Sequence, residues 1–415
     1  MTSVPAAAPA APPLPASPTG DAMPSQAPVY PPVSPSAPTP QVVSKSHLSV
    51  ADRQRLATAI VYCEANFGEV DGKTANGLVR HSEKYDIVAV IDSHRAGLDS
   101  GIVLDGEPNA IPICFDLEAA LAHADRVPDY FIFGIAPSSG MLSVHERALV
   151  LKAIGLGMDI VSGLHEFLAD DPEFAAASAA NGVLIRDVRK PRATNDLRVF
   201  SDRISEVECP RIAILGTDCA IGKRTTATVL TQALREQGLK AVMVGTGQTG
   251  LMQGARYGVA LDAVPTQFCA GELEATIVEA YEAEKPDVII IEGQGALSHP
   301  AFSTSSFILR GSCPQAVILQ HAPGRAHRCD FPAMAMPEPR WEIELIETFA
   351  DTQVIGLTIN HENMDEAQVD ATIAQYEREL GVIATDALMR SPASLVDMVL
   401  TAFPELAGMS SAATR

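Results

Sequence analysis

The sequence predicts an α/β protein with a Rossmann-like N-terminal domain and a P-loop NTPase-like C-terminal domain, both with mainly parallel sheets. Three observations predict this fold class. Short runs of β-branched apolar residues alternate with segments of helical spacing from about residue 55 onward. A strand, a glycine-bearing loop and a helix follow one another from Arg211. The chain of 415 residues is long enough for two domains and a tail.

Residues 1–48 differ in composition from everything that follows. Thirteen prolines fall within the first 40 positions, and Asp21 and Lys45 are the only charged side chains before residue 46. Such a segment contains too little apolar surface to offset the entropy of ordering it. It also lacks the basic start and unbroken apolar core of a secretory signal. We therefore expect residues 1–48 to form a disordered tail rich in proline and alanine.

The first predicted domain covers residues 49–200. Its expected strands are residues 57–63, 86–92, 129–136, 159–163 and 183–188, and its expected helices include residues 116–124 and 146–157. Strands that are apolar on both faces, with helices between them, indicate a parallel sheet that is covered on both sides. The polar stretch 190–202 has the composition of a linker.

The second predicted domain covers residues 201–410. Its expected strands are residues 211–215, 241–245, 287–293, 315–320 and 352–360. Its expected helices are residues 223–237, 271–284 and 367–380. The same alternation of strand and helix again predicts a mainly parallel sheet.

Charge and cysteine usage limit the partners of this chain. The formal net charge is −21, which argues against nucleic acid and against an anionic membrane surface. No apolar run approaches the 18 residues or so of a membrane span. The seven cysteines are dispersed and form no CxxC pair, as is typical of a reduced, cytoplasmic protein. The sequence is compatible with a homo-oligomer and does not determine the oligomeric state.

The segment "GTDCAIGKRTT", residues 216–226, has the character of a phosphate-binding loop. A strand precedes it and a helix that begins with a lysine follows, so backbone N–H groups and the helix dipole face the same point. Arg224 stands where P-loop NTPases have the Ser or Thr that binds magnesium, which favours holding a phosphate-bearing carrier over hydrolysing ATP. The alternative is a tight turn with an exposed lysine. The candidate phosphate-binding residues are Gly216, Thr217, Asp218, Gly222, Lys223, Arg224, Thr225 and Thr226.

Three further polar loops follow predicted strands of the second domain, where open α/β sheets bind their ligands. The loop at 245–250 contains Gly247, Gln248 and Thr249, which we assign to cofactor binding. The loop at 292–300 contains Glu292, Gln294 and His299, of which Gln294 is also assigned to cofactor binding. The loop at 321–325 contains His321 and Arg325. Each loop alone is compatible with a simple glycine turn. Together with the phosphate-binding loop they predict one ligand site.

Other polar residues are weaker candidates. Arg189 and Arg325 are predicted to bind the carboxylates of an acidic substrate, and His165 is placed with them. Asp262 is a substrate-binding or metal-binding candidate. Cys219 is the one cysteine that lies within a motif, although most cysteines of such a protein serve as small buried apolar residues.

Several of these motifs occur together in a known family. "GTDCAIGKRTTA", "GTGQTG", "EGQGALSHP", "GLHEFLADDP" and "RDVRKP" resemble the D-glutamate N-acetyltransferase family over about residues 55–405. The loop with five residues between its glycines also resembles that of dethiobiotin synthetase. The first resemblance implies a Rossmann-like domain, a P-loop domain, and transfer of an acetyl group from acetyl-CoA to the amine of D-glutamate. It does not settle the substrate of this member or its general base.

Three functions remain open at the level of sequence. The first is acetyl-CoA-dependent N-acetylation of an acidic amino acid, with Glu292 or His299 as the base that deprotonates the amine. The second is an ATP- and Mg²⁺-dependent enzyme like dethiobiotin synthetase, in which Asp262 and Glu292 hold the metal. The third is a nucleotide-binding regulatory protein. The first requires no metal, and its partner is a small acidic amino acid.

Overall fold

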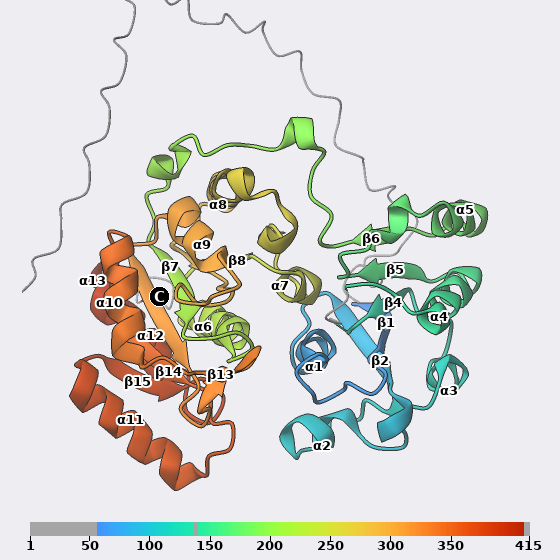
Figure 1. Ribbon diagram of the computed structural model, residues 1–415, viewed down its shortest axis with the longest axis horizontal. Helices are drawn as coiled ribbons and strands as arrows, with labels where there is room; N and C mark the ends of the chain where they lie inside the picture. Colours follow the sequence, from blue (N-terminus) through green and yellow to red (C-terminus); the bar gives the residue numbers. More distant parts are fainter. Residues whose placement is uncertain (1–55, 136–139, 411–415) are drawn as a thin grey trace, which may run out of the picture. The chain divides into compact units, whose positions relative to one another are not determined.

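The first parallel sheet contains six strands. Figure 1 shows the computed structural model, which describes residues 56–135 and 140–410; the predicted tail at 1–48 lies outside them. The strand order is β3-β2-β1-β4-β5-β6, and every neighbouring pair is parallel. The strands are β1 (Ala57–Tyr62), β2 (Tyr85–Ile91), β3 (Ile113–Cys114), β4 (Tyr130–Phe133), β5 (Asp159–Ser162) and β6 (Ile185–Asp187). This strand order is Rossmann-like, which confirms the fold class that the sequence predicts for this domain.

Helices lie between these strands along the chain. They are α1 (Lys73–Arg80), α2 (Ser100–Asp105), α3 (Leu117–Ala122), α4 (Val144–Gly155) and α5 (Pro172–Asn181). Helix α4 begins at a capping box, because the Ser143 hydroxyl accepts from the N–H of Glu146 and the Glu146 carboxylate accepts from the N–H of Ser143. Helix α5 begins with Pro172. The first N–H groups of a helix have no acceptor within the helix, so proline loses no hydrogen bond at this position.

The second sheet contains seven strands in the order β15-β14-β11-β7-β10-β8-β9, again all parallel. They are β7 (Arg211–Gly216), β8 (Ala241–Gly245), β9 (Tyr257–Gly258), β10 (Val288–Ile291), β11 (Ala316–His321), β14 (Gln353–Ile359) and β15 (Ile383–Asp386). A separate antiparallel hairpin contains β12 (His327–Arg328) and β13 (Phe331–Ala335). The helices are α6 (Lys223–Glu236), α7 (Gln248–Gln253), α8 (Cys269–Glu284), α9 (Thr304–Ser312), α10 (Pro339–Phe349), α11 (Glu366–Leu380), α12 (Ala393–Ala402) and α13 (Pro404–Ser410).

Alternate residues of β7 enter two different cores. Ala213 and Leu215 belong to a cluster that includes residues of α8 and α9, whereas Ile212 and Ile214 belong to a cluster that includes residues of α6 and α12. Successive side chains of a strand point to opposite faces, so both faces of the sheet are covered by helices. The covered parallel sheet predicted from the apolar strands is confirmed.

The order of the strands brings the predicted loops together. Strand β7 lies between β10 and β11, so the segments that follow these three strands meet at one edge of the sheet. Strand β8, which precedes residues 246–250, is the other neighbour of β10. After β7 the chain runs first to β8, on the β10 side of this strand, and later to β11 on the opposite side. Such a reversal is the switch point where open α/β sheets bind ligands.

The structure also contains helices and strands that were not predicted from the sequence. Strands β9 and β15, helix α7 and the β12–β13 hairpin are short, and two-residue strands have no detectable period. Among residues 56–135 and 140–410, no helix has both the length and the hydropathy that crossing a bilayer would require.

Candidate functional site

The phosphate-binding loop connects β7 to α6 and has the backbone that its glycines predict. Gly222 has φ +106°, a conformation that L side chains rarely adopt, and it is the residue immediately before α6. No side chain of the described residues caps α6, so the N–H groups of its first turn stay available for an anion. The Lys223 ammonium is buried and donates to the backbone oxygen of Asp218. The ammonium group of Lys223 therefore lies inside the phosphate-binding loop.

Two of the predicted phosphate donors hold the loop on the neighbouring strand β11 instead. Thr217 donates its N–H to Gln320 O at 3.0 Å, and its hydroxyl lies 2.8 Å from His321 Nδ1. The Thr226 hydroxyl donates to Gln320 Oε1 at 2.6 Å. Since these groups are already paired, they support the loop's shape. Thr225 is half-buried in the first turn of α6.

Arg224 faces α7. Its guanidinium donates to Gln253 Oε1, and burial lowers the pKa of Arg224 to about 10, while the nearby charge of Glu292 opposes that shift. A guanidinium does not bind Mg²⁺, so this position carries no equivalent of the magnesium-binding hydroxyl of P-loop NTPases. Its predicted contact with a nucleotide phosphate stays a prediction.

Glu292 lies at the end of β10 and is almost completely buried. Its Oε2 accepts from the N–H groups of Thr246, at 2.9 Å, and Gly247, at 3.3 Å. Burial raises the pKa of Glu292, which these two hydrogen bonds and Arg224 partly oppose. Gln294 donates to Thr246 O at 2.9 Å, so the loops after β8 and β10 meet as predicted. A raised pKa is the property that a general base near neutral pH requires.

The rest of the loop after β8 packs inward. Gln248 and Thr249 are buried, and the Thr249 hydroxyl lies 3.0 Å from that of Thr74 in α1. A Cβ at Gly250 would stand 2.4 Å from Glu292 Oε2, so only glycine fits there without a shift. The hydrogen bonds of this loop with Glu292 therefore come from Thr246 and Gly247, and not from Gln248 or Thr249.

The His299 ring is buried beside the phosphate-binding loop, and its hydrogen bonds define its tautomer. The N–H groups of Ala301 and Phe302 donate to Nδ1 at 3.3 and 3.2 Å. The proton of the neutral ring is therefore on Nε2, and His299 presents a donor at that atom. Burial lowers the pKa of His299, which also favours the neutral ring. This geometry opposes the predicted role of His299 as a base, since Nε2 has no lone pair to offer.

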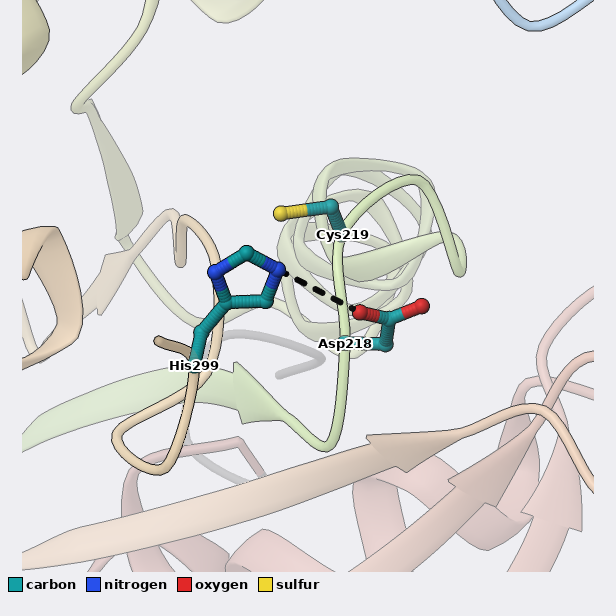
Figure 2. Close-up of side chains that lie close together, drawn as sticks. All are labelled: Asp218, Cys219 and His299. Carbon is teal, nitrogen blue, oxygen red and sulfur yellow. Dashed lines mark ion pairs between the residues drawn. The ribbon is translucent and has the colours of Figure 1, made fainter. Parts of the chain in front are cut away.

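Asp218 and Cys219 lie opposite this donor (Figure 2). Asp218 Oδ1 is 3.7 Å from His299 Nε2, and both side chains are fully buried. The ligand atoms of Asp218, Cys219 and His299 all lie within 4.8 Å of one another. Carboxylate, thiol and imidazole are metal-binding groups, but Nε2 would have to lose its proton while Nδ1 still accepts two N–H groups. The three side chains therefore fit a metal ion poorly.

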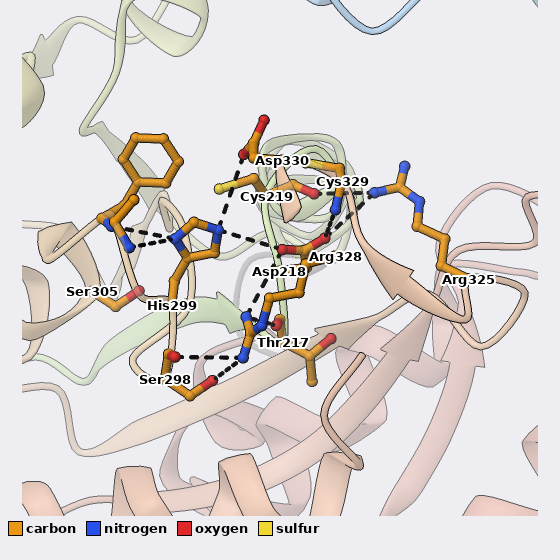
Figure 3. Close-up of polar contacts among 12 residues, drawn as sticks. Thr217, Asp218, Cys219, Ser298, His299, Ser305, Arg325, Arg328, Cys329 and Asp330 are labelled. Atoms are coloured by element: carbon orange, nitrogen blue, oxygen red, sulfur yellow. Dashed lines mark hydrogen bonds and ion pairs between the residues drawn. The ribbon is translucent and has the colours of Figure 1, made fainter. Parts of the chain in front are cut away.

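The β12–β13 hairpin completes this site, as Figure 3 shows. The N–H of Cys329 donates to Asp218 Oδ2 at 2.8 Å. Arg328 donates to Thr217 O at 3.0 Å and to the Ser298 hydroxyl at 2.7 Å, so it links the phosphate-binding loop to the loop that carries His299. Sequence reasoning missed this hairpin, although "HRCD" at 327–330 places four chemically active residue types in succession.

The thiols of Cys219 and Cys329 also interact. Cys219 lies in the phosphate-binding loop and Cys329 in the hairpin, and a hydrogen bond joins the two side chains. That bond, with help from the charge of Lys223, lowers the pKa of Cys219. The pKa of Cys329 is raised by the same bond and by burial.

The residues predicted to bind substrate carboxylates occupy two places. Arg325 joins the phosphate-binding loop, where it donates to Ala220 O at 2.9 Å and pairs with Glu362 at 2.6 Å. Arg189 pairs with Asp262 at 2.9 Å. His165, with its side chain half exposed, lies 4.0 Å from the same carboxylate. Desolvation and the charge of Arg189 lower the pKa of His165.

Comparison with known proteins agrees with this architecture. The P-loop domain described as Domain of unknown function (DUF1611_C) matches residues 198–396, and the Rossmann-like domain described as Domain of unknown function (DUF1611_N) matches residues 93–191. A crystal structure of a DUF1611 family protein from Anabaena variabilis superposes with a TM-score of 0.77 at 34% identity, over 83% of this chain and 99% of that one.

Two curated relatives are named D-glutamate N-acetyltransferase. The protein from Tritonibacter scottomollicae is 30% identical over 272 residues, which is 64% of this chain and 79% of its own. The protein from Pseudoalteromonas sp is 32% identical over 272 residues, or 64% of this chain and 80% of its own. Fold and site thus define a two-domain protein with a Rossmann-like half and a P-loop half. The chain belongs to the DUF1611 family, and its similarity to the two curated relatives confirms the resemblance found in its sequence.

Proposed function

We propose that this protein is an N-acetyltransferase that moves an acetyl group from acetyl-CoA to the amine of D-glutamate or a similar acidic amino acid, in D-amino acid catabolism. The observation that carries the proposal is membership of a family with two relatives named D-glutamate N-acetyltransferase, of which the match covers 79% and 80%. The cytoplasm, where acetyl-CoA is available, is the proposed location.

The phosphate-binding loop suits a carrier that is bound and released intact. Lys223 and the uncapped first turn of α6 supply positive charge and N–H donors for a diphosphate. Arg224 replaces the hydroxyl that would hold magnesium and is itself paired with Gln253. In this proposal the loop holds the diphosphate of coenzyme A, and no metal takes part.

Attack on the thioester requires a free amine, whereas an amino acid arrives as an ammonium ion. Glu292 is the proposed acceptor of that proton, because its carboxylate is buried, has a raised pKa and keeps a fixed position through two backbone N–H groups. His299 is not proposed for this step, since its Nε2 already carries a proton.

The acceptor's carboxylates need cationic partners. Arg189, Arg325 and His165 remain the proposed ones. In the structure Arg189 pairs with Asp262 and Arg325 with Glu362. At each arginine, a substrate carboxylate would therefore replace the protein carboxylate that is paired with it. Two such arginines favour an acceptor with two carboxylates over an acceptor with one.

One assay distinguishes this function from its alternative. Purified protein is incubated with D-glutamate and acetyl-CoA, or with D-glutamate and Mg-ATP, while free thiol and phosphate are measured, with and without EDTA. We expect thiol release that depends on D-glutamate and persists in EDTA. Phosphate release that requires magnesium would instead support the ATP-dependent enzyme, with Asp262 and Glu292 as metal ligands.

A further inference from the structure

Two buried polar atoms face each other beside the phosphate-binding loop without a hydrogen-bond partner. Other charged atoms nearby are Arg328 Nη1, 3.9 Å from Asp218 Oδ1, and Asp330 Oδ2, 4.0 Å from His299 Nε2. Asp218 Oδ1 and His299 Nε2 have no hydrogen-bond partner among the described residues, and both side chains are fully buried. An unpaired buried donor or acceptor destabilises the fold, and a charged one does so more strongly. Two such atoms in one place, pointing toward one another in Figure 2, indicate a position made for a ligand group.

The distance between them defines that group. At 3.7 Å they are too far apart to bond directly, but one oxygen about 2.8 Å from each fits between them. Nε2–H can only donate and the carboxylate Oδ1 can only accept, so this oxygen must accept one hydrogen bond and donate another. A hydroxyl group or a water molecule does both. A phosphoryl oxygen has no proton to donate and would meet the negative charge of Asp218.

The position adjoins the place where a phosphate would bind. The Lys223 ammonium donates to the backbone oxygen of Asp218, so a phosphate held by Lys223 stands next to this residue. If Lys223 holds the outer phosphate of the diphosphate, the group attached to that phosphate faces Asp218 and His299. In ATP this group is the terminal phosphate. In coenzyme A it is the pantoic part of the arm, which carries a hydroxyl group beside two methyl groups close to the diphosphate.

We propose that Asp218 and His299 form a hydroxyl-binding subsite that receives the hydroxyl of the coenzyme A arm and rejects the terminal phosphate of a nucleoside triphosphate. The aromatic rings of Phe302 and Phe331 lie 4.7 and 5.5 Å from the His299 ring and supply the apolar surface that the neighbouring methyl groups need. This inference rests on the proposed function for the identity of the carrier. It assigns the two residues to carrier recognition, separate from the proton transfer at Glu292.

The test compares three ligands that share a diphosphate. Coenzyme A adds the hydroxyl-bearing arm and a 3′-phosphate, ATP adds a terminal phosphate and ADP adds neither. Each ligand is titrated by calorimetry in EDTA, and the contribution of the 3′-phosphate cancels when a variant is compared with the wild type. In Asp218→Asn, the side-chain oxygen stays on the Cys329 N–H, which places the amide NH₂ where Oδ1 was. The subsite then has two donors, which suit a phosphate and not a hydroxyl. We expect the ratio of Kd for coenzyme A to Kd for ADP to rise about 10- to 100-fold, and ATP to bind more tightly relative to ADP.

Two further variants separate this cause from others. Asp330→Asn also removes a negative charge near His299, but from a side chain that is 47% exposed and therefore screened by solvent. It should change the Kd values of the three ligands by the same factor. His299→Asn keeps an acceptor for the N–H groups of Ala301 and Phe302 but has no Nε2, so it should raise the coenzyme A to ADP ratio without improving ATP. Circular dichroism of each variant checks the fold.

The outcomes also separate this inference from the proposed function. If Asp218→Asn and His299→Asn weaken coenzyme A and ADP equally, or leave both unchanged, the gap holds water only and the subsite is refuted. Selective loss of coenzyme A binding, in a protein that does not acetylate D-glutamate, would support the subsite and refute the proposed acceptor. If the wild-type protein binds ATP and ADP but no coenzyme A, both proposals fail.

Discussion

Replacing Glu292 by glutamine tests the proposed general base with little change in shape. The amide oxygen of glutamine can still accept from the N–H groups of Thr246 and Gly247, so the loops after β8 and β10 should stay in place. What disappears is a basic carboxylate. General-base catalysis contributes about 10²- to 10⁴-fold, so we expect kcat to fall by that factor while the Kd of acetyl-CoA is maintained.

The same substitution has a predictable effect on stability. Burial raises the pKa of Glu292, so the folded protein binds this proton more tightly than the unfolded chain does. The wild-type protein therefore has its full stability below the unfolded pKa of about 4.3 and loses part of it as pH rises through the higher folded pKa. Glutamine cannot ionise. The variant should match the wild type near pH 4 and exceed its Tm at pH 8, by about 3–5 °C for each pH unit by which burial raises this pKa.

Turnover by thiol release and Tm by calorimetry, each between pH 4 and pH 9, check both parts. Glu274 offers a matched control, since it is also buried and accepts from the N–H groups of Ser201 and Ile204, which lie in the segment before β7 and outside the proposed site. Glu274→Gln should keep its kcat. A Glu292→Gln protein with wild-type kcat would refute the base, and a Tm that falls relative to the wild type as pH rises would refute the reasoning about burial. Activity that is lost in EDTA and restored by magnesium would make Glu292 a metal ligand.

Three other predictions concern separate parts of the chain. Lys223→Ala should raise the Kd of coenzyme A and of ADP together by about 10-fold or more in calorimetry, and a change confined to one ligand would contradict a shared phosphate site. Gly250→Ala should lower stability by about 1–3 kcal/mol in urea denaturation, because its Cβ would stand 2.4 Å from Glu292 Oε2. Gly155→Ala, which meets nothing within 4 Å at the end of α4, should not, and equal losses in the two would argue against the crowding. Removal of residues 1–45 should leave Tm unchanged, since they contain little apolar material, and a lower Tm would mean that they pack on the domains.

The long apolar strands could be predicted well from the sequence. The run Val-Ile-Ile-Ile at 288–291 is completely buried in β10. Few conformations other than a central strand bury four β-branched side chains in succession. Two-residue strands such as β9 depend on their neighbours in the sheet and carry no pattern of their own. The β12–β13 hairpin was missed because β12 has only two residues and β13 is mostly exposed, so neither strand shows a buried apolar pattern.

The site was predictable in its location but not in its details. Loops after neighbouring parallel strands must meet, and so the positions of Glu292 and Gln294 beside residues 246–247 followed from the strand pattern. The tautomer of His299 depends on two N–H groups only three residues further along, whose direction is set by the turn and not by residue type. The contact between Cys219 and Cys329 joins residues far apart in the sequence, which no local pattern reveals.

The position of β7 in its sheet has a consequence for how this protein is made. The neighbours of strand β7 (Arg211–Gly216) in the sheet are β10 and β11, at residues 288–291 and 316–321, which leave the ribosome much later. Pairing over such separations has a loop-closure cost and is slow compared with local contacts. The N-terminal sheet, complete by Asp187, is able to fold first, while the strand that leads into the phosphate-binding loop waits unpaired. A nascent chain that stops before β11 therefore lacks one neighbour of β7 and exposes an apolar strand edge, and any quality control acting on this protein would encounter it at that stage of synthesis.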